Sequence, residues 1–163
     1  MRKFCKLPAR IDHVAIAVLN IEESLFFFRD ILGFELLNKR EVKGKFSGMI
    51  AVELDAHGFN IVLVQGTKPD SQVSRYINDF GPGVQHIAIE VEDIEGLVES
   101  LEAKGMKFAT NIINGKSLVQ VFSQRDHNSG MMFEFIKKEL RESKFEKNNI
   151  QELFDQLELN GAY

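Results

Sequence analysis

The chain contains a single cysteine among its 163 residues, so it cannot form a disulfide bond within itself. No run of apolar residues approaches the length of a membrane span, and residues 1–8 lack the apolar core of a secretory signal peptide. Because free thiols persist in reducing compartments, these absences favour a cytoplasmic protein with no membrane association.

An excess of positive charge is also missing. The 20 lysine and arginine residues are scattered and outnumbered by 24 aspartate and glutamate residues, which gives a formal net charge of −4. Phosphate backbones and anionic lipids attract basic patches. Because the sequence shows no such patch, neither nucleic acid nor a membrane surface is expected as a partner. A chain with 44% hydrophobic residues can bury one substantial core, and we predict a single domain over residues 1–163.

What the sequence does have is an internal repeat. A histidine begins an apolar, β-rich run in residues 11–18 (IDHVAIAV) and again in residues 84–91 (VQHIAIEV), and His13 and His86 are 73 residues apart. When the two copies of the repeat are aligned on these histidines, with a one-residue adjustment later in the copies, Val62 of the first copy corresponds to Glu134 of the second. The repeat predicts an α+β fold built from two tandem βαβββ modules.

The modules are expected over residues 11–66 and 84–138, with a linking helix in residues 67–83 and a polar linker and C-terminal helix in residues 139–163. The expected strands are 11–18, 34–37, 47–54 and 59–64 in the first module and 84–91, 106–110, 117–124 and 131–136 in the second. The expected helices are 21–32, 71–80, 94–104 and a last one from Asn149, whose apolar stripe must pack on the core or cover a site.

Three residues at matching places in the repeat could hold a metal. His13 and His86 begin the first strand of each module, and Glu134 lies inside the apolar run MMFEFI, where an ionised carboxylate is costly unless it is paired or metal-bound. Two imidazoles and a carboxylate form the facial triad of non-haem Fe(II) oxygenases, which leaves metal positions open. The fourth place in the repeat is Val62, which cannot coordinate a metal. The alternatives are two core histidines and a Glu134 that pairs with lysine or arginine.

Three glutamines are the second polar feature. Gln72 opens the linking helix, Gln85 precedes the second histidine, and Gln120 interrupts the apolar run LVQVF. A buried amide needs hydrogen-bond partners, which the backbone alone can provide. Of the three, Gln120 is the one whose position in a buried strand points to a specific role.

Six segments carry a family resemblance: IDHV (11–14), SQV (71–73), GPGVQHIA (81–88), LVQVF (118–122), MFEFI (132–136) and NIQELF (149–154). On these segments the chain resembles the vicinal oxygen chelate superfamily of paired βαβββ modules. Within it, the chain is most similar to the catalytic half of 4-hydroxyphenylpyruvate dioxygenase.

The resemblance implies an Fe(II)-dependent dioxygenase that uses O2 to decarboxylate and hydroxylate a 2-oxo acid. It implies that His13, His86 and Glu134 hold the iron, although other divalent metals suit the same ligands. The substrate would be contacted by glutamines, one aromatic ring and an active-site lid formed by the last helix, namely Gln72, Gln85, Gln120, Phe122, Asn149, Ile150 and Phe154.

The chain also departs from that family. The family has a non-catalytic module pair before the catalytic one, whereas these 163 residues are expected to hold one pair. The lid reads Asn148-Asn149-Ile150 in place of Gly-Asn-Phe, and Met132 stands at a usual phenylalanine position. Residues 111–116 are shorter than the family's insertion there. The pocket is therefore expected to be reshaped, and the resemblance implies 2-oxo acid chemistry more directly than a 4-hydroxyphenyl substrate.

Two other functions remain open. A methylmalonyl-CoA epimerase-like isomerase shares residues 11–18 and the following helix, but it needs a fourth ligand and a carboxylate base, where the alignment gives Val62 and Ala51 with Glu53 nearby. A metal-free module that only holds a ligand would tolerate loss of the Glu134 charge. The two modules are expected to form a cup around the metal. The linker at residues 66–80 allows this cup to form within one chain or by exchange of modules in a homodimer.

Overall fold

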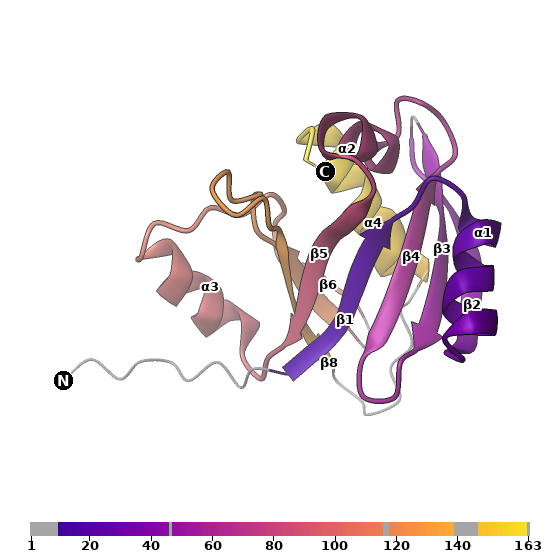
Figure 1. Cartoon of the computed structure of the whole chain (residues 1–163). Helices are drawn as coiled ribbons and strands as arrows, with labels where there is room; N and C mark the ends of the chain where they lie inside the picture. The colour runs from indigo at the N-terminus through magenta and orange to yellow at the C-terminus, as the bar shows by residue number, and fades with distance from the viewer. Residues whose placement is uncertain (1–9, 46, 116–117, 139–146, 163) are drawn as a thin grey trace.

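The protein is described by a computed structural model that covers residues 10–45, 47–115, 118–138 and 147–162, with side chains from residue 151 onward in the last helix. Eight strands form one mixed sheet in the order β2-β3-β4-β1-β5-β8-β7-β6 (Figure 1). The strands are β1 (Arg10–Ala17), β2 (Glu35–Lys43), β3 (Gly48–Asp55), β4 (Asn60–Gly66), β5 (Gly83–Glu90), β6 (Ile113–Asn114), β7 (Leu118–Phe122) and β8 (Phe133–Lys138). The helices are α1 (Ile21–Leu25), the π-helix η1 (Phe26–Ile31), α2 (Gln72–Phe80), α3 (Ile94–Glu102) and α4 (Lys147–Leu159).

The sheet has two similar halves that meet between β1 and β5. These central strands pair antiparallel, β1 pairs parallel with β4, and β5 pairs parallel with β8. Outward from there, β3 and β2 follow antiparallel on one side and β7 and β6 on the other. The predicted α+β fold of two βαβββ units is therefore confirmed, and the two units join into one sheet within the same chain.

Alternation of side chains along each strand separates the two faces of the sheet. On the outer face, α1 packs on a cluster that includes Val52 and Leu63, and α3 packs on one that includes Val121 and Phe135. The inner face is filled by the C-terminal helix α4, whose Phe154 packs with β2 and β3 and whose Leu157 packs with residues of the second half. The sheet and α4 thus enclose the side chains that point inward.

The first helix differs from the sequence prediction. Asn20 caps it as expected, because its Oδ1 accepts hydrogen bonds from the amides of Glu22 and Glu23 at 2.9 and 3.2 Å. The α-helical part ends at Leu25, however, and the remainder is the π-helix η1. At this turn Phe28 packs against Phe34, with ring centroids 6.2 Å apart. Apolar periodicity alone does not distinguish a π-helical turn from an α-helical one.

The strand predicted at residues 106–110 is also wrong. Only an isolated bridge joins Phe108 to Ser123, and the edge strand β6 forms later in the chain. The reason is Thr110, whose hydroxyl accepts a 3.0 Å hydrogen bond from the Phe122 amide in place of a backbone carbonyl. A side chain that bonds to a neighbouring backbone in this way interrupts a regular ladder.

The last helix begins at Lys147, two residues before the predicted start at Asn149. The side chains of Asn149 and Ile150 lie outside the described residues. Among the helices that are described, none is long and apolar enough to cross a membrane.

Candidate metal centre

Three neighbouring strands of the central sheet bring His13, His86 and Glu134 together. In the antiparallel β1–β5 pair His13 lies opposite Ala88, and in the parallel β5–β8 pair Ala88 lies beside Glu134. Ala88 is fully buried, and its methyl group leaves room for the longer side chains on either side. The internal repeat thus places two histidines near the common axis of the two halves, with the carboxylate on the adjoining strand.

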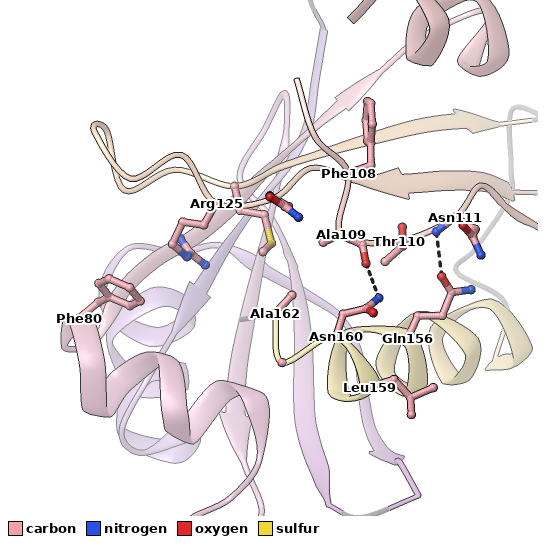
Figure 2. Close-up of a pocket in the computed structure, with 13 residues that line it drawn as sticks. Phe80, Phe108, Ala109, Thr110, Asn111, Arg125, Gln156, Leu159, Asn160 and Ala162 are labelled. Atoms are coloured by element: carbon pink, nitrogen blue, oxygen red, sulfur yellow. Dashed lines mark hydrogen bonds between the residues drawn. The ribbon is translucent and has the colours of Figure 1, made fainter. Parts of the chain in front are cut away.

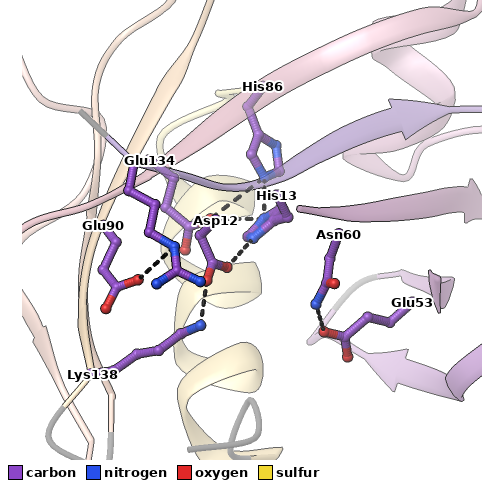
Figure 3. A network of polar contacts seen from close by, with 9 residues as sticks. Asp12, His13, Glu53, Asn60, His86, Glu90, Glu134 and Lys138 are labelled. Carbon is purple, nitrogen blue, oxygen red and sulfur yellow. Dashed lines mark hydrogen bonds and ion pairs between the residues drawn. The ribbon is translucent and has the colours of Figure 1, made fainter. Parts of the chain in front are cut away.

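The three side chains converge on one point (Figure 3). The Nε2 atoms of the two histidines lie 3.3 Å apart, and Glu134 Oε2 lies 3.2 Å from Nε2 of His13 and 3.6 Å from Nε2 of His86. Metal–ligand bonds of about 2.0–2.2 Å separate neighbouring ligand atoms by about 3 to 3.5 Å. The spacing therefore matches three ligands on one face of a divalent metal.

The outer nitrogen of each histidine has an acceptor that orients the ring. Nδ1 of His13 lies 2.9 Å from Asp12 Oδ2, and Nδ1 of His86 lies 3.1 Å from Gln85 Oε1. A proton on each Nδ1 satisfies these oxygens and leaves the Nε2 lone pairs facing the shared point. Partners of this kind fix the tautomer of metal-binding histidines.

Glu134 supplies a further indication that a cation fits here. The residue is 1% exposed, and its Oε1 has no hydrogen-bond partner among the described residues. A buried carboxylate oxygen without a partner costs free energy that a bound cation would recover. Lys138, which could have neutralised Glu134, instead binds Asp12, so the alternative of a Glu134–lysine pair is not what the described residues form.

The protonation of the three groups is strongly coupled. Burial lowers the pKa of His13, but hydrogen bonds to Asp12 and Glu134 outweigh it and raise the pKa to about 9. Burial lowers the pKa of His86, and the contact with Glu134 does not restore it. Burial raises the pKa of Glu134, but hydrogen bonds to the two histidines outweigh it and hold the pKa below its usual value. Without a metal, a proton on His13 thus takes the place of the cation.

Sequence reasoning missed Asp12 as part of this site. It is 8% exposed, and Lys138 forms an ion pair with its other oxygen. Burial raises the pKa of Asp12, but hydrogen bonds to His13 and Lys138 outweigh it and lower the pKa. The available signal was an acidic residue next to a histidine at the start of an apolar strand.

The place of a fourth ligand is apolar. Val62 and Ala51 are 7% and 4% exposed, and both belong to the apolar cluster on the inner face. Glu53 lies further along β3, where its Oε1 accepts a 2.9 Å hydrogen bond from Asn60, the residue beside His13 in the β1–β4 pair (Figure 3). Among the described residues of the first module, His13 is therefore the single ligand of the candidate centre.

A small cavity of about 40 Å³ adjoins His86. Its lining includes four of the predicted substrate residues, Gln72, Gln85, Phe122 and Phe154. The ring of Phe122 meets the ring of His86 edge-on, with centroids 5.0 Å apart and an interplanar angle of 77°. Gln120 is fully buried on the same strand as Phe122 but does not line this cavity.

A larger cavity of about 850 Å³ lies between the end of α4 and the second module (Figure 2). Met132 lines both cavities. Across it, Asn160 donates a 2.6 Å hydrogen bond to the carbonyl of Ala109, and Gln156 accepts a 3.0 Å bond from the amide of Asn111. These bonds tie the end of α4 to the second half of the protein.

A family model described as "Glyoxalase/Bleomycin resistance protein/Dioxygenase superfamily" matches residues 10–135. The chain belongs to this superfamily. The match spans both halves of the sheet and all three candidate ligands, so the predicted membership of the vicinal oxygen chelate superfamily is confirmed.

Relatives within the superfamily have different activities. The chain is 29% identical over 103 residues to 4-hydroxyphenylpyruvate dioxygenase of Legionella pneumophila, covering 60% of this chain and 30% of that protein. It is 32% identical over 110 residues to human mitochondrial methylmalonyl-CoA epimerase, covering 60% of this chain and 55% of that protein. The structure of a 4-hydroxymandelate synthase mutant from Streptomyces coelicolor has a TM-score of 0.81 at 20% identity, covering 94% of this chain and 54% of that one.

The chain thus spans about a third to a half of the length of these curated relatives. At such identities the solved structure supports the fold, and the dioxygenase and epimerase matches support a superfamily of metal-dependent enzymes that contains both activities.

Proposed function

We propose that this protein is a non-haem Fe(II) dioxygenase that oxidatively decarboxylates and hydroxylates a 2-oxo acid. The observation that supports the proposal most is the three-ligand set of His13, His86 and Glu134 beside the apolar Val62. Three ligands on one face, with no fourth among the described residues, leave room at a metal for a bidentate substrate and dioxygen. Bound there, Fe(II) would supply the redox chemistry that joins dioxygen to the substrate.

The surrounding residues would bind and orient the substrate. Gln72 is 5% exposed, and its Oε1 has no hydrogen-bond partner among the described residues, so it can accept a bond from a ligand. The ring of Phe122 lies beside His86 and lines the same cavity. Phe154 and Leu157 of α4 close the cavity with apolar side chains and so exclude water from the reaction.

The small cavity beside His86 limits what can bind without a rearrangement of side chains. A volume of about 40 Å³ is small for a 2-oxo acid, since one water molecule occupies about 30 Å³ in the liquid. We expect side chains that line the cavity, those of α4 among them, to move when substrate binds. This expectation agrees with a lid role for α4 and makes the helix part of the proposed binding site.

Anaerobic reconstitution with Fe(II), followed by titration with aromatic and aliphatic 2-oxo acids, tests the proposal. A weak visible absorption band that appears with one substrate class, and bleaches on exposure to oxygen with release of carbon dioxide, is the expected result. The variants H86A and E134A should lose the band, whereas H57A, which alters an exposed histidine in the turn before β4, should keep it. Absence of a band with every acid tested would refute the dioxygenase.

A second candidate is an epimerase that moves a proton next to a thioester. Glu53 favours it, because this carboxylate lies on the same β3 face as Ala51 and is held by Asn60 beside His13. A positioned carboxylate of this kind can act as a general base. Exchange of the α-proton of an acyl-CoA for deuterium that is lost in E53Q would support the epimerase. A metal-free binding module would instead keep its ligand affinity in E134Q.

A further inference from the structure

Arg125 lies in the segment that connects β7 to β8, outside the metal-binding set. Its Nη1 donates hydrogen bonds to the carbonyl of Gly130 at 2.7 Å and to the carbonyl of Gln85 at 3.1 Å. Gln85 immediately precedes His86, and Gly130 begins the segment that leads to Glu134. One guanidinium therefore links the backbone before two of the three candidate ligands.

Two aromatic rings of α2 hold the same guanidinium. Cζ of Arg125 lies 4.7 Å from the ring centroid of Tyr76 and 5.3 Å from that of Phe80, toward which the side chain points (Figure 2). The Tyr76 hydroxyl donates a 2.8 Å hydrogen bond to the carbonyl of Val84. Burial lowers the pKa of Arg125, but a guanidinium stays charged in proteins, so the cation–π contacts persist.

These contacts converge where β5 begins to pair with β8. The Ile87 amide donates a 3.2 Å bond to the carbonyl of Met132, and Ala88 then pairs with Glu134. Gln85 also orients the His86 ring through its Oε1. A rotation of the Gln85 peptide would therefore displace the ring of His86 relative to Glu134.

We propose that Arg125 is a positioning residue that fixes His86 relative to Glu134 and thereby sets the affinity and geometry of the metal centre. This proposal rests on the proposed metal site. A lysine retains the charge, but it lacks the planar guanidinium that stacks on the rings of Tyr76 and Phe80 while its Nη1 bonds both carbonyls. Charge alone is therefore insufficient at this position.

The test compares R125K and R125M with R75M, which removes an exposed arginine of α2 that bonds the carbonyl of Asp70. Titration with Co(II) measures metal affinity, and the Co(II) absorption bands report ligand geometry. We expect both Arg125 variants to bind Co(II) about 10- to 100-fold more weakly, the size of effect seen when partners of metal ligands are removed, with altered bands. R75M should match the unmodified protein.

A second readout needs no metal. The long-range proton–nitrogen NMR spectrum of the metal-free protein reports the tautomer and environment of the His86 ring, and its signals should shift in R125K. Unchanged His86 signals and unchanged Co(II) binding in R125K would overturn the proposal, as would a loss of thermal stability alone. If the unmodified protein binds no metal, the proposed function fails and the His86 signals decide the role of Arg125. If R125M does not fold, the comparison is made with R125K alone.

Discussion

The Nε2 atoms of His13 and His86 lie 3.3 Å apart, although 73 residues separate the two histidines in the chain. Both lone pairs cannot face each other at this distance without a proton or a cation between them. The largely buried site, with the carboxylate of Glu134 beside it, favours a positive charge at the shared point. The two similar halves of the sheet thus place a candidate cation site at their junction.

Replacing Glu134 by glutamine is expected to lower the affinity for a divalent metal by more than about 100-fold, since the loss of an outer partner alone costs about 10- to 100-fold. The amide keeps the shape of the side chain but removes the negative charge. Titration with Co(II) measures the effect, and E99Q, which alters an exposed carboxylate on α3, is the matched control. Equal affinities in the two variants would contradict the assignment of Glu134 as a ligand.

Metal binding is expected to release about one proton at pH 7.5. In the metal-free protein His13 is protonated up to its pKa of about 9, whereas the lowered pKa of His86 leaves that ring neutral. Because the metal must displace the His13 proton, its affinity should fall about tenfold for each pH unit below 9. Calorimetry in buffers of different ionisation enthalpy counts the proton, and a count of zero would show that His13 is not a ligand.

The stability of the metal-free protein should depend on pH in the opposite sense. The raised pKa of His13 contributes stability that is fully present below about pH 6.5, the ordinary pKa of histidine, and is lost as the pH rises through about 9. Thermal unfolding with a chelator present, measured between pH 6 and pH 9, is expected to show this decline. H13A should remove the contribution of His13 to it.

The repeat made the pair of histidines predictable, and the apolar neighbours of Glu134 made the carboxylate predictable. The first inference rests on self-similarity of the sequence and the second on the cost of burying a charge, and neither requires knowledge of tertiary structure. Gln72 and Gln85 were predicted by resemblance, and they do line the cavity beside His86. Their role in binding a substrate stays a prediction.

Strand alternation does not predict a buried Asp12, because the alternation fails there. A register shift between Ile11 and His13 in the β1–β5 pair lets two successive residues, Asp12 and His13, both be buried. Such an irregularity turns a side chain toward the site, and it depends on the partner strand. The break at Thr110 likewise depends on the distant Phe122 amide.

Replacing Asp12 by asparagine is expected to weaken metal binding by about 10- to 100-fold while leaving the ligands in place. An amide oxygen accepts the His13 proton less strongly than a carboxylate, so Nε2 becomes a poorer ligand, and the pKa of His13 should fall. Metal titration and NMR titration of His13 measure the two effects. K138M tests whether Lys138 acts through Asp12, and an unchanged His13 pKa in D12N would argue against the orienting role.

Replacing Phe154 by alanine should release α4 from the inner face of the sheet without unfolding the sheet. Phe154 is fully buried against Val42 and Met49, and its ring lies so near Gly44 that an added Cβ would come within 2.4 Å of it. Removing a buried phenylalanine costs about 3–5 kcal/mol, and the expected response is local undocking of the helix that carries it.

Hydrogen exchange resolves where the loss of Phe154 acts. The amides of α4 should exchange faster in F154A, and also in G44A, where the new methyl group displaces the same ring, while the central strands β1 and β5 keep their protection. L159A, at a position 72% exposed on the same helix, should change neither. Faster exchange in β1 and β5 to the same extent as in α4 would mean that the helix is a fixed part of the core. A 2-oxo acid would then have to enter by displacing other side chains. Met132 is the first candidate, because it lines both cavities.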